Sequence, residues 1–233
     1  MNMKRIIAAV VCLIGFSFAG FAQKSSPRVP RKPVKNTLTD AEKETRFVRD
    51  LMKKMTLTEK IGQLSQYVGG ELLTGPKSGA VSDSLFVRGM VGSILNVGGV
   101  DNLRKLQQKN MESSRLKIPI LFAFDVIHGY KTIFPTPLAE SCSWDLALMY
   151  ETAKAAAIEA SASGIHWTFA PMVDVARDPR WGRIVEGAGE DTYLGCKIAE
   201  ARVRGFQWNL GKPNALFACA KHFVAYGAPQ AGR

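Results

Sequence analysis

Charged side chains stand directly after three apolar segments of this sequence. The three groups are Asp125 to His128, Asp174 to Pro179, and Lys221-His222. A carboxylate accepts hydrogen bonds from two neighbouring hydroxyls, while arginine, lysine and histidine donate to hydroxyl oxygens. Gathered at one place, such groups would bind the hydroxyls of a sugar, and a tryptophan would add an apolar surface for the ring. The candidate tryptophans are Trp144, Trp167 and Trp181. Each charged group could equally belong to a structural ion pair.

The apolar segments do not alternate with polar residues, which predicts strands covered on both faces. Parallel strands joined by helices have this property. The expected strands are 91–95, 119–124, 167–173 and 216–220. The expected helices are two that begin at the capping boxes Thr39/Glu42 and Thr56/Glu59, then 101–114, 146–163 and 193–208.

This pattern predicts an α/β fold, either a (β/α)8 barrel of the TIM type or a doubly wound sheet. Polar residues after several strands favour the barrel, which collects its chemistry at the carboxyl ends of many strands. A dinucleotide-binding sheet should show one G-x-G-x-x-G turn, and none occurs. A complete barrel takes about 250 residues. With four strands visible, we expect an incomplete barrel, about its first half.

The N-terminal residues predict export from the cytoplasm. Lys4 and Arg5 precede the apolar stretch 6–18, and small residues end at Ala22, as in a secretory signal. We therefore expect a signal peptide at 1–22, a basic Ser/Pro-rich leader at 23–38, and a partial barrel domain at 39–233. The protein would be secreted or periplasmic. No other apolar run reaches the ~20 residues of a membrane-spanning helix, so no membrane association is expected after the signal is removed.

Net charge and cysteines exclude other classes of protein. The formal charge is +11, but the chain before residue 36 carries seven of the cations and no acid. The remainder shows no basic stripe with interleaved aromatic residues, so nucleic-acid binding is not expected. Cys142, Cys196 and Cys219 lack metal-ligand spacing. We expect no metal and no cofactor.

Four segments together are similar to the β-glucosidases of glycoside hydrolase family 3. They are FDVIHGYKTIFP at 124–135, APMVDVARDPRWGR at 170–183, EGAGEDTY at 186–193 and KHFVAYG at 221–227. The segment MTLTEKIGQL at 55–64 resembles the first barrel helix of the same enzymes. The similarity runs from about Val48 to the last residue.

The resemblance implies an exo-acting, retaining β-glucosidase that hydrolyses terminal nonreducing β-D-glucosyl residues of β-linked glucosides or oligosaccharides. Such enzymes use a nucleophilic aspartate and an acid/base glutamate, with carboxyl groups about 5–5.5 Å apart. By the same resemblance, Asp125 would accept hydrogen bonds from sugar hydroxyls, and Arg183, Lys221 and His222 would donate to sugar oxygens. The family also implies a cis peptide bond between Lys221 and His222.

The sequence departs from the family at the catalytic residues. The nucleophile of these enzymes lies in a Ser-Asp-Trp-like or Ser-Asp-His-like motif, and nothing here matches it. Ser143-Trp144-Asp145 has a different order and begins a helix. We therefore expect an N-terminal part of the enzyme, inactive by itself, with no catalytic carboxylate in this chain and the nucleophile downstream of Arg233. The alternatives are a β-xylosidase or other β-glycosidase of the family, or a non-catalytic sugar-binding protein.

Other polar residues of the same loops are expected to hold the loops in place. They are His128, Asp174, Asp178, Glu186, Glu190 and Asp191. His166, on an expected strand, is interpreted as a core histidine with its hydrogen bonds satisfied.

Overall fold

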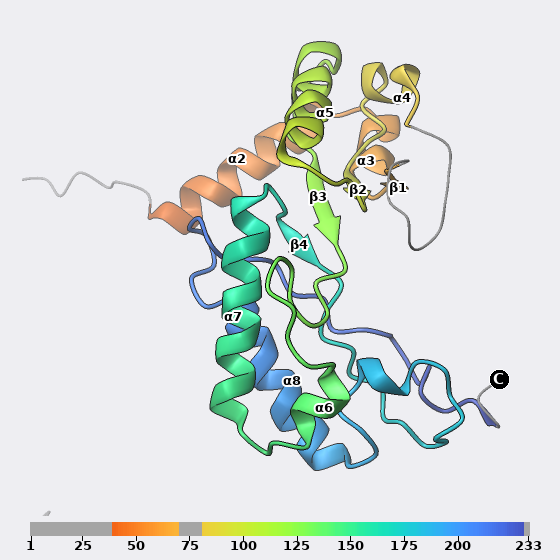
Figure 1. Ribbon diagram of the computed structural model, residues 1–233. Helices are drawn as coiled ribbons and strands as arrows, with labels where there is room; N and C mark the ends of the chain where they lie inside the picture. Colours follow the sequence, from red (N-terminus) through yellow and green to blue (C-terminus); the bar gives the residue numbers. More distant parts are fainter. Residues whose placement is uncertain (1–38, 70–80, 231–233) are drawn as a thin grey trace, which may run out of the picture. The chain divides into compact units, whose positions relative to one another are not determined.

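Four parallel strands form the sheet in a computed structural model that describes residues 39–69 and 81–230. The strands are β1 (Gln66–Val68), β2 (Ser93–Leu95), β3 (Leu121–Phe124) and β4 (Trp167–Thr168), and Figure 1 shows β3 and β4 side by side. Their order in the sheet is β1-β2-β3-β4, the order of the sequence. A doubly wound sheet reverses its strand order at a switch point, whereas a barrel adds each strand beside the last. The order therefore confirms the predicted parallel α/β fold of the barrel type, of which a part is present.

Helices connect the strands and carry the caps that the sequence predicts. They are α2 (Asp40–Lys54), α3 (Leu57–Gln63), α4 (Asp83–Val87), α5 (Val100–Ser113), α6 (Pro137–Ser141), α7 (Leu146–Ala162), the 3-10 turn η2 (Ile184–Glu186) and α8 (Thr192–Phe206). The Thr56 side chain accepts from the Glu59 N–H at the start of α3, and the Glu59 side chain accepts from the Thr56 N–H. Gly164, with a φ of 90°, follows the end of α7 as expected.

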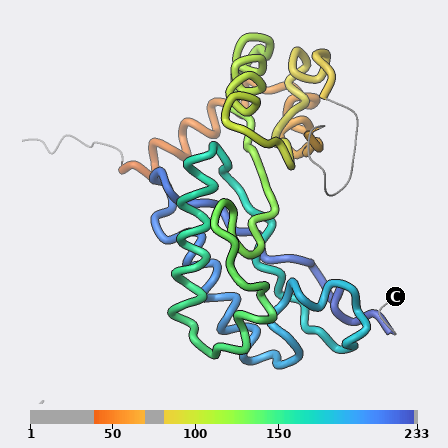
Figure 2. The backbone as a smooth tube through the Cα atoms, viewed as in Figure 1, coloured from red at the N-terminus to blue at the C-terminus, as the bar shows by residue number. Residues whose placement is uncertain are grey.

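The core lies between the sheet and the helices that follow β3 and β4. Ile94 and Phe122 of the sheet belong to one buried cluster with Ala157 of α7 and Phe206 of α8. Helices α7 and α8 lie side by side in Figures 1 and 2 and make the most extensive contact between elements. Gly205 permits this close approach, because a Cβ at that position would lie 2.4 Å from the carbonyl oxygen of Tyr150.

A buried ion pair joins α8 to α6. The Arg202 guanidinium donates to the Glu140 carboxylate and to the backbone carbonyl of Ile127. The two side chains are 4% and 5% exposed. Burial lowers the pKa of Arg202 from its usual value, while the charge of Glu140 opposes that effect.

The expected strands 167–173 and 216–220 are wrong in extent. Strand β4 has two residues, and the later segment forms isolated bridges with the chain around it, Trp167–Phe217 within β4 and Met172–Lys221 beyond its end. Backbone hydrogen bonds still run between the two segments, such as Thr168 N to Phe217 O at 2.9 Å. Pro171 has no N–H to donate, but its carbonyl accepts from Lys221 N at 3.1 Å, so the two segments stay paired up to Lys221.

Several short elements are not expected from the sequence, among them β1, α4, α6 and η2. Strand β1 has three residues and begins with the exposed Gln66, so it shows no apolar run. Helices α4 and α6 have five residues each, too few to display a helical period.

The chain divides into two units, residues 1–46 and 47–233. The structure describes only residues 39–46 of the first, where Glu42 N donates to Thr39 Oγ1 at 3.3 Å and Thr39 N donates to Glu42 Oε2 at 2.7 Å. The expected signal peptide (1–22) and leader (23–38) lie outside the described residues. Within the described ranges, every helix is too short or too polar to cross a bilayer.

Candidate functional site

The four predicted sugar-binding residues lie in the segments that follow β3, β4 and the chain segment paired beside β4. Asp125 follows β3 directly, and Lys221-His222 follow the segment that pairs with β4. Arg183 lies in the long loop after β4, at the start of η2. In Figure 2 this loop and the segment after residue 216 run beside each other, and Val173 N donates to Lys221 O at 2.7 Å. Parallel pairing thus places both cationic segments beside the end of β3.

Hydrogen bonds and ion pairs connect the four residues into one cluster. Lys221 Nζ lies 3.3 Å from Asp125 Oδ1 and 3.9 Å from Glu186 Oε2. Arg183 donates to both carboxylate oxygens of Glu186, from Nε at 2.6 Å and from Nη2 at 2.7 Å. Arg183 Nη1 lies 3.3 Å from His222 Nε2. The structure therefore brings Asp125, Arg183, Lys221 and His222 together, with Glu186 at the centre of the charged groups.

The two partners of the His222 ring determine its tautomer. Asp174 Oδ2 lies 2.7 Å from His222 Nδ1 and also accepts from the His222 backbone N–H at 3.1 Å. Arginine has no acceptor atom, so Arg183 must donate to Nε2. Nδ1 then carries the proton and donates to Asp174. Asp174, whose side chain is 1% exposed, fixes both the tautomer and the ring orientation.

The peptide bond between Lys221 and His222 is cis, as the resemblance implies. The structure also has cis peptide bonds at Ala170–Pro171 and Phe223–Val224.

An aromatic side chain that the sequence analysis missed packs on the cluster. The Tyr226 ring lies 4.8 Å from the His222 ring, edge to face, and the Arg183 guanidinium carbon lies 5.5 Å from its centre. Trp181 packs edge to face against Tyr226, with ring centres 5.4 Å apart. Nothing in the short segment KHFVAYG marks Tyr226 as part of the site, because its role depends on the return of the chain toward Arg183.

The candidate tryptophans occupy three different environments. Trp181 is 4% exposed and belongs to a small buried cluster with Met172 and Ala176. Trp167 packs against Phe169 with ring centres 4.6 Å apart. Trp144 is 74% exposed before α7 and makes none of the contacts that join the cluster. Burial of Trp181 supports the loop that carries Arg183.

The charges of Arg183 and Glu186 stabilise each other. The hydrogen bonds with Glu186 raise the pKa of Arg183 above its usual value. The same bonds, with a smaller effect of the Lys221 charge, lower the pKa of Glu186. Both groups are therefore ionised at neutral pH. The Asp125 side chain is 42% exposed, against 13% for Lys221, so the carboxylate is the more accessible of the pair.

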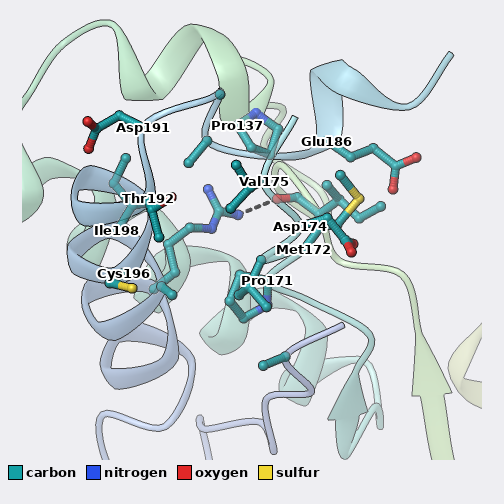
Figure 3. Close-up of a pocket in the computed structure, with 18 residues that line it drawn as sticks. Pro137, Pro171, Met172, Asp174, Val175, Glu186, Asp191, Thr192, Cys196 and Ile198 are labelled. Atoms are coloured by element: carbon teal, nitrogen blue, oxygen red, sulfur yellow. Dashed lines mark hydrogen bonds between the residues drawn. The ribbon is translucent and has the colours of Figure 1, made fainter. Parts of the chain in front are cut away.

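A cavity of about 390 Å³ lies between the loop after β4 and helix α8. Figure 3 shows Asp174 and Glu186 on one side of it and Thr192, Cys196 and Ile198 of α8 on the other. The four predicted residues do not line this cavity. Asp174 and Glu186 thus separate the cavity from the cluster.

Most of the remaining loop residues have local partners. Asp178 accepts from Arg180, Asp191 accepts from the Leu194 N–H at the start of α8, and His128 Nδ1 lies 3.1 Å from Phe134 O. Glu190 is exposed.

His166 differs from the interpretation as a core histidine. Its Nδ1 accepts from the Phe122 N–H at 3.1 Å, but the residue is exposed because it lies before β4, at the end of the sheet opposite the cluster. In the part of the chain that the structure describes, no three His, Cys, Asp or Glu side chains are grouped to hold a metal ion.

Comparisons with known proteins agree with the fold and the motifs. The model of the glycosyl hydrolase family 3 N-terminal domain matches residues 56–232. The "Periplasmic beta-glucosidase" of Salmonella typhimurium is 44% identical over 191 residues, 80% of this chain and 24% of that protein. "Beta-D-xylosidase 3" of Arabidopsis thaliana is 34% identical over 190 residues, 77% of this chain and 21% of that protein.

A solved structure extends the agreement to three dimensions. The β-glucosidase of Listeria innocua in complex with isofagomine has a TM-score of 0.73 and 41% identity, and covers 80% of this chain and 27% of that one. The chain spans about a quarter of the length of the relatives it matches. The family match, the parallel sheet and the motifs brought together in the cluster agree: this chain belongs to glycosyl hydrolase family 3, and residues 56–232 match its N-terminal, barrel-type domain.

Proposed function

We propose that this chain is the N-terminal part of a secreted or periplasmic, exo-acting, retaining β-glucosidase. Its substrates would be β-linked glucosides or oligosaccharides with a terminal nonreducing glucosyl residue. The observation that carries the proposal is the cluster in which Asp125, Arg183, Lys221 and His222 meet. Glucose and laminaribiose complexes of the Listeria innocua β-glucosidase support the substrate class.

The cluster offers complementary groups to a glucosyl ring. Asp125 is the accessible carboxylate, and its two oxygens would accept from hydroxyls on adjacent carbons. Lys221 and Arg183 would donate to sugar oxygens with charge-assisted hydrogen bonds. The Arg183–His222 contact of 3.3 Å is long for a hydrogen bond, so a sugar hydroxyl would compete with Arg183 as the donor to His222 Nε2. In this tautomer His222 would accept from the sugar, where the sequence leads us to expect a donor. These bonds would orient the ring and strengthen as it flattens in the transition state.

The chemical step needs two further carboxyl groups. A retaining glycosidase uses a nucleophile and an acid/base residue, and no Ser-Asp-Trp-like motif occurs between residues 1 and 233. We therefore propose that both catalytic residues lie downstream of Arg233 and that this chain alone binds sugar without hydrolysing it. This chain matches only about a quarter of the length of each relative, which supports the proposal that the catalytic residues lie in another part of the protein.

The test compares the purified chain 23–233 with the product of the complete coding region, using an aryl β-glucoside. We expect hydrolysis by the longer protein and no turnover above background by 23–233. Hydrolysis by 23–233 would show that the nucleophile lies in this chain. A longer protein inactive on every β-glycoside would leave the non-catalytic sugar-binding alternative.

A β-xylosidase is the second candidate, because xylosidases of the family are among the relatives. Xylose lacks the hydroxymethyl group of glucose, so the two sugars differ at one edge of the ring. Comparing kcat/KM for aryl β-glucoside and aryl β-xyloside decides between them. We expect the glucoside to be preferred.

A further inference from the structure

Glu186 makes contacts that go beyond holding its own turn. It lies three residues after Arg183 at the end of η2, so a local ion pair would suffice to stabilise the turn. Its Oε2 also approaches Lys221 Nζ at 3.9 Å, from a segment 35 positions along the chain. One carboxylate therefore joins the two cations of the candidate sugar site.

We propose that Glu186 is a positioning residue for the sugar site: it holds Arg183 and Lys221 at the spacing that a glucosyl ring requires. This inference rests on the proposed function. It makes Glu186 neither a catalytic residue nor a ligand of the sugar, but the shared counter-ion of two groups that are.

The hydrogen-bond partners of the Glu186 carboxylate support a positioning role. Oε1 accepts from Arg183 Nε at 2.6 Å, and Oε2 accepts from Arg183 Nη2 at 2.7 Å while facing Lys221. The Glu186 side chain is 21% exposed, against 42% for Asp125. Both oxygens are thus engaged with protein groups, so a substrate hydroxyl meets Asp125 in preference to Glu186.

The bidentate geometry sets the direction of the guanidinium. Two parallel N–H···O bonds fix the plane of Arg183, and this plane directs Nη1 toward His222. The ring of Tyr226 lies against the same guanidinium. Arg183 therefore has one preferred orientation, set from one side by Glu186 and from another by Tyr226.

The Glu186 carboxylate offsets the electrostatic repulsion between Arg183 and Lys221. Arg183 and Lys221 each lie within 4 Å of the same carboxylate, and like charges at short range repel, most strongly where water is partly excluded. The Lys221 side chain is 13% exposed, and its second carboxylate partner is Asp125. Without Glu186, Lys221 would turn further toward Asp125 and compete with the sugar hydroxyls for that carboxylate.

The test uses Glu186→Gln in the protein expressed from the complete coding region. Glutamine keeps the size but offers one acceptor oxygen and an NH2 donor, so the NH2 would face an N–H of Arg183. A misplacement of about 1 Å in a binding group costs on the order of 100-fold in rate. We expect kcat/KM for an aryl β-glucoside to fall about 100-fold and the inhibition constant of glucose to rise in parallel. Glu186→Asp, which keeps the charge, should recover part of the loss.

Glu200→Gln is the matched control. Glu200 also pairs with two cations, Lys197 at 4.0 Å and Arg204 at 3.5 Å, but on the exposed surface of α8. Losing this carboxylate should change kcat/KM less than twofold. A general effect of removing one negative charge would appear equally in both variants.

A double-mutant cycle separates positioning from simple bracing of the loop. If Glu186 acts through Arg183 and Lys221, Glu186→Gln should cost less in a variant that already carries Arg183→Ala than in wild type, and the remaining loss should come from Lys221. Additive losses, or wild-type kinetics and glucose inhibition in Glu186→Gln, would overturn the inference. A wild-type enzyme that hydrolyses no β-glucoside would contradict the proposed function and with it this inference. Should Glu186→Gln fail to fold, Glu186→Asp in both backgrounds gives a cycle of the same form, with a smaller loss in each.

Discussion

Two glycines of helix α8 should respond in opposite directions to the same substitution. A Cβ at Gly205 would lie 2.4 Å from the Tyr150 carbonyl oxygen and 2.8 Å from the Ala153 Cβ, both on α7. A Cβ at Gly195 would meet no atom within 4 Å. Gly205→Ala therefore tests the packing of α7 against α8, and Gly195→Ala is its control within the same helix.

The magnitudes follow from two competing effects. Alanine is favoured over glycine inside a helix by about 1 kcal/mol, and Gly195→Ala should gain up to this amount. At Gly205 the close atoms include a backbone carbonyl, which cannot rotate away, so α7 and α8 must separate. Overpacking of this kind costs about 1–3 kcal/mol. Because the helix-propensity gain applies to both positions of α8, the free energies of unfolding of the two variants should differ by the overpacking cost, roughly 1–3 kcal/mol.

Urea unfolding of wild type and both variants, followed by circular dichroism, measures the difference. Gly205→Ala should unfold at lower urea than wild type, and Gly195→Ala at equal or higher urea, with unchanged m-values. If Gly205→Ala were as stable as Gly195→Ala, α7 and α8 would not approach each other as closely as the structure has them.

Three further outcomes follow from the described contacts. Glu140→Ala should lower the free energy of unfolding by about 3–5 kcal/mol, because it leaves the Arg202 charge buried and unpaired; Glu140→Leu with Arg202→Met, measured by the same urea unfolding, should lose much less. Glu59 has its pKa lowered to about 2 by hydrogen bonds from Arg115 and Thr56; it therefore stabilises the fold above its unfolded pKa of about 4.3 and loses this effect as the pH falls toward 2. The Tm of wild type should then fall more steeply between pH 5 and 2 than that of Glu59→Gln, and equal slopes would contradict the pairing. Asp174→Asn should reduce kcat/KM more than Asp178→Asn, because only Asp174 fixes the His222 tautomer.

The fold could be predicted where the sequence carries long signals. Helices α5, α7 and α8 are each fourteen residues or longer, and their predicted ranges agree with the structure within two residues at each end. Strand β1 could not be found, because three residues beginning with an exposed glutamine show no pattern. The extent of β4 also depends on its pairing with the segment at 216–220, and a local stretch of sequence does not reveal such pairing.

The candidate site divides in the same way. Asp125, Arg183, Lys221 and His222 come from motifs that resemble a family, and the parallel ladder explains why they meet. The contribution of Glu186 to Lys221 could not be predicted, because it depends on a contact across 35 positions. Tyr226 likewise gains its place from the return of the chain to Arg183. Such contacts are tertiary, whereas motif and periodicity are local.

A crystal structure of the complete protein with bound glucose tests the glucosyl site most directly. We expect one glucose whose hydroxyls contact the Asp125 carboxylate, with Arg183 and Lys221 donating to the same sugar, His222 Nε2 accepting from one of its hydroxyls, and Glu186 still joined to both cations. Glucose bound elsewhere, with these side chains keeping only their contacts to one another, would show that the cluster is a structural ion network.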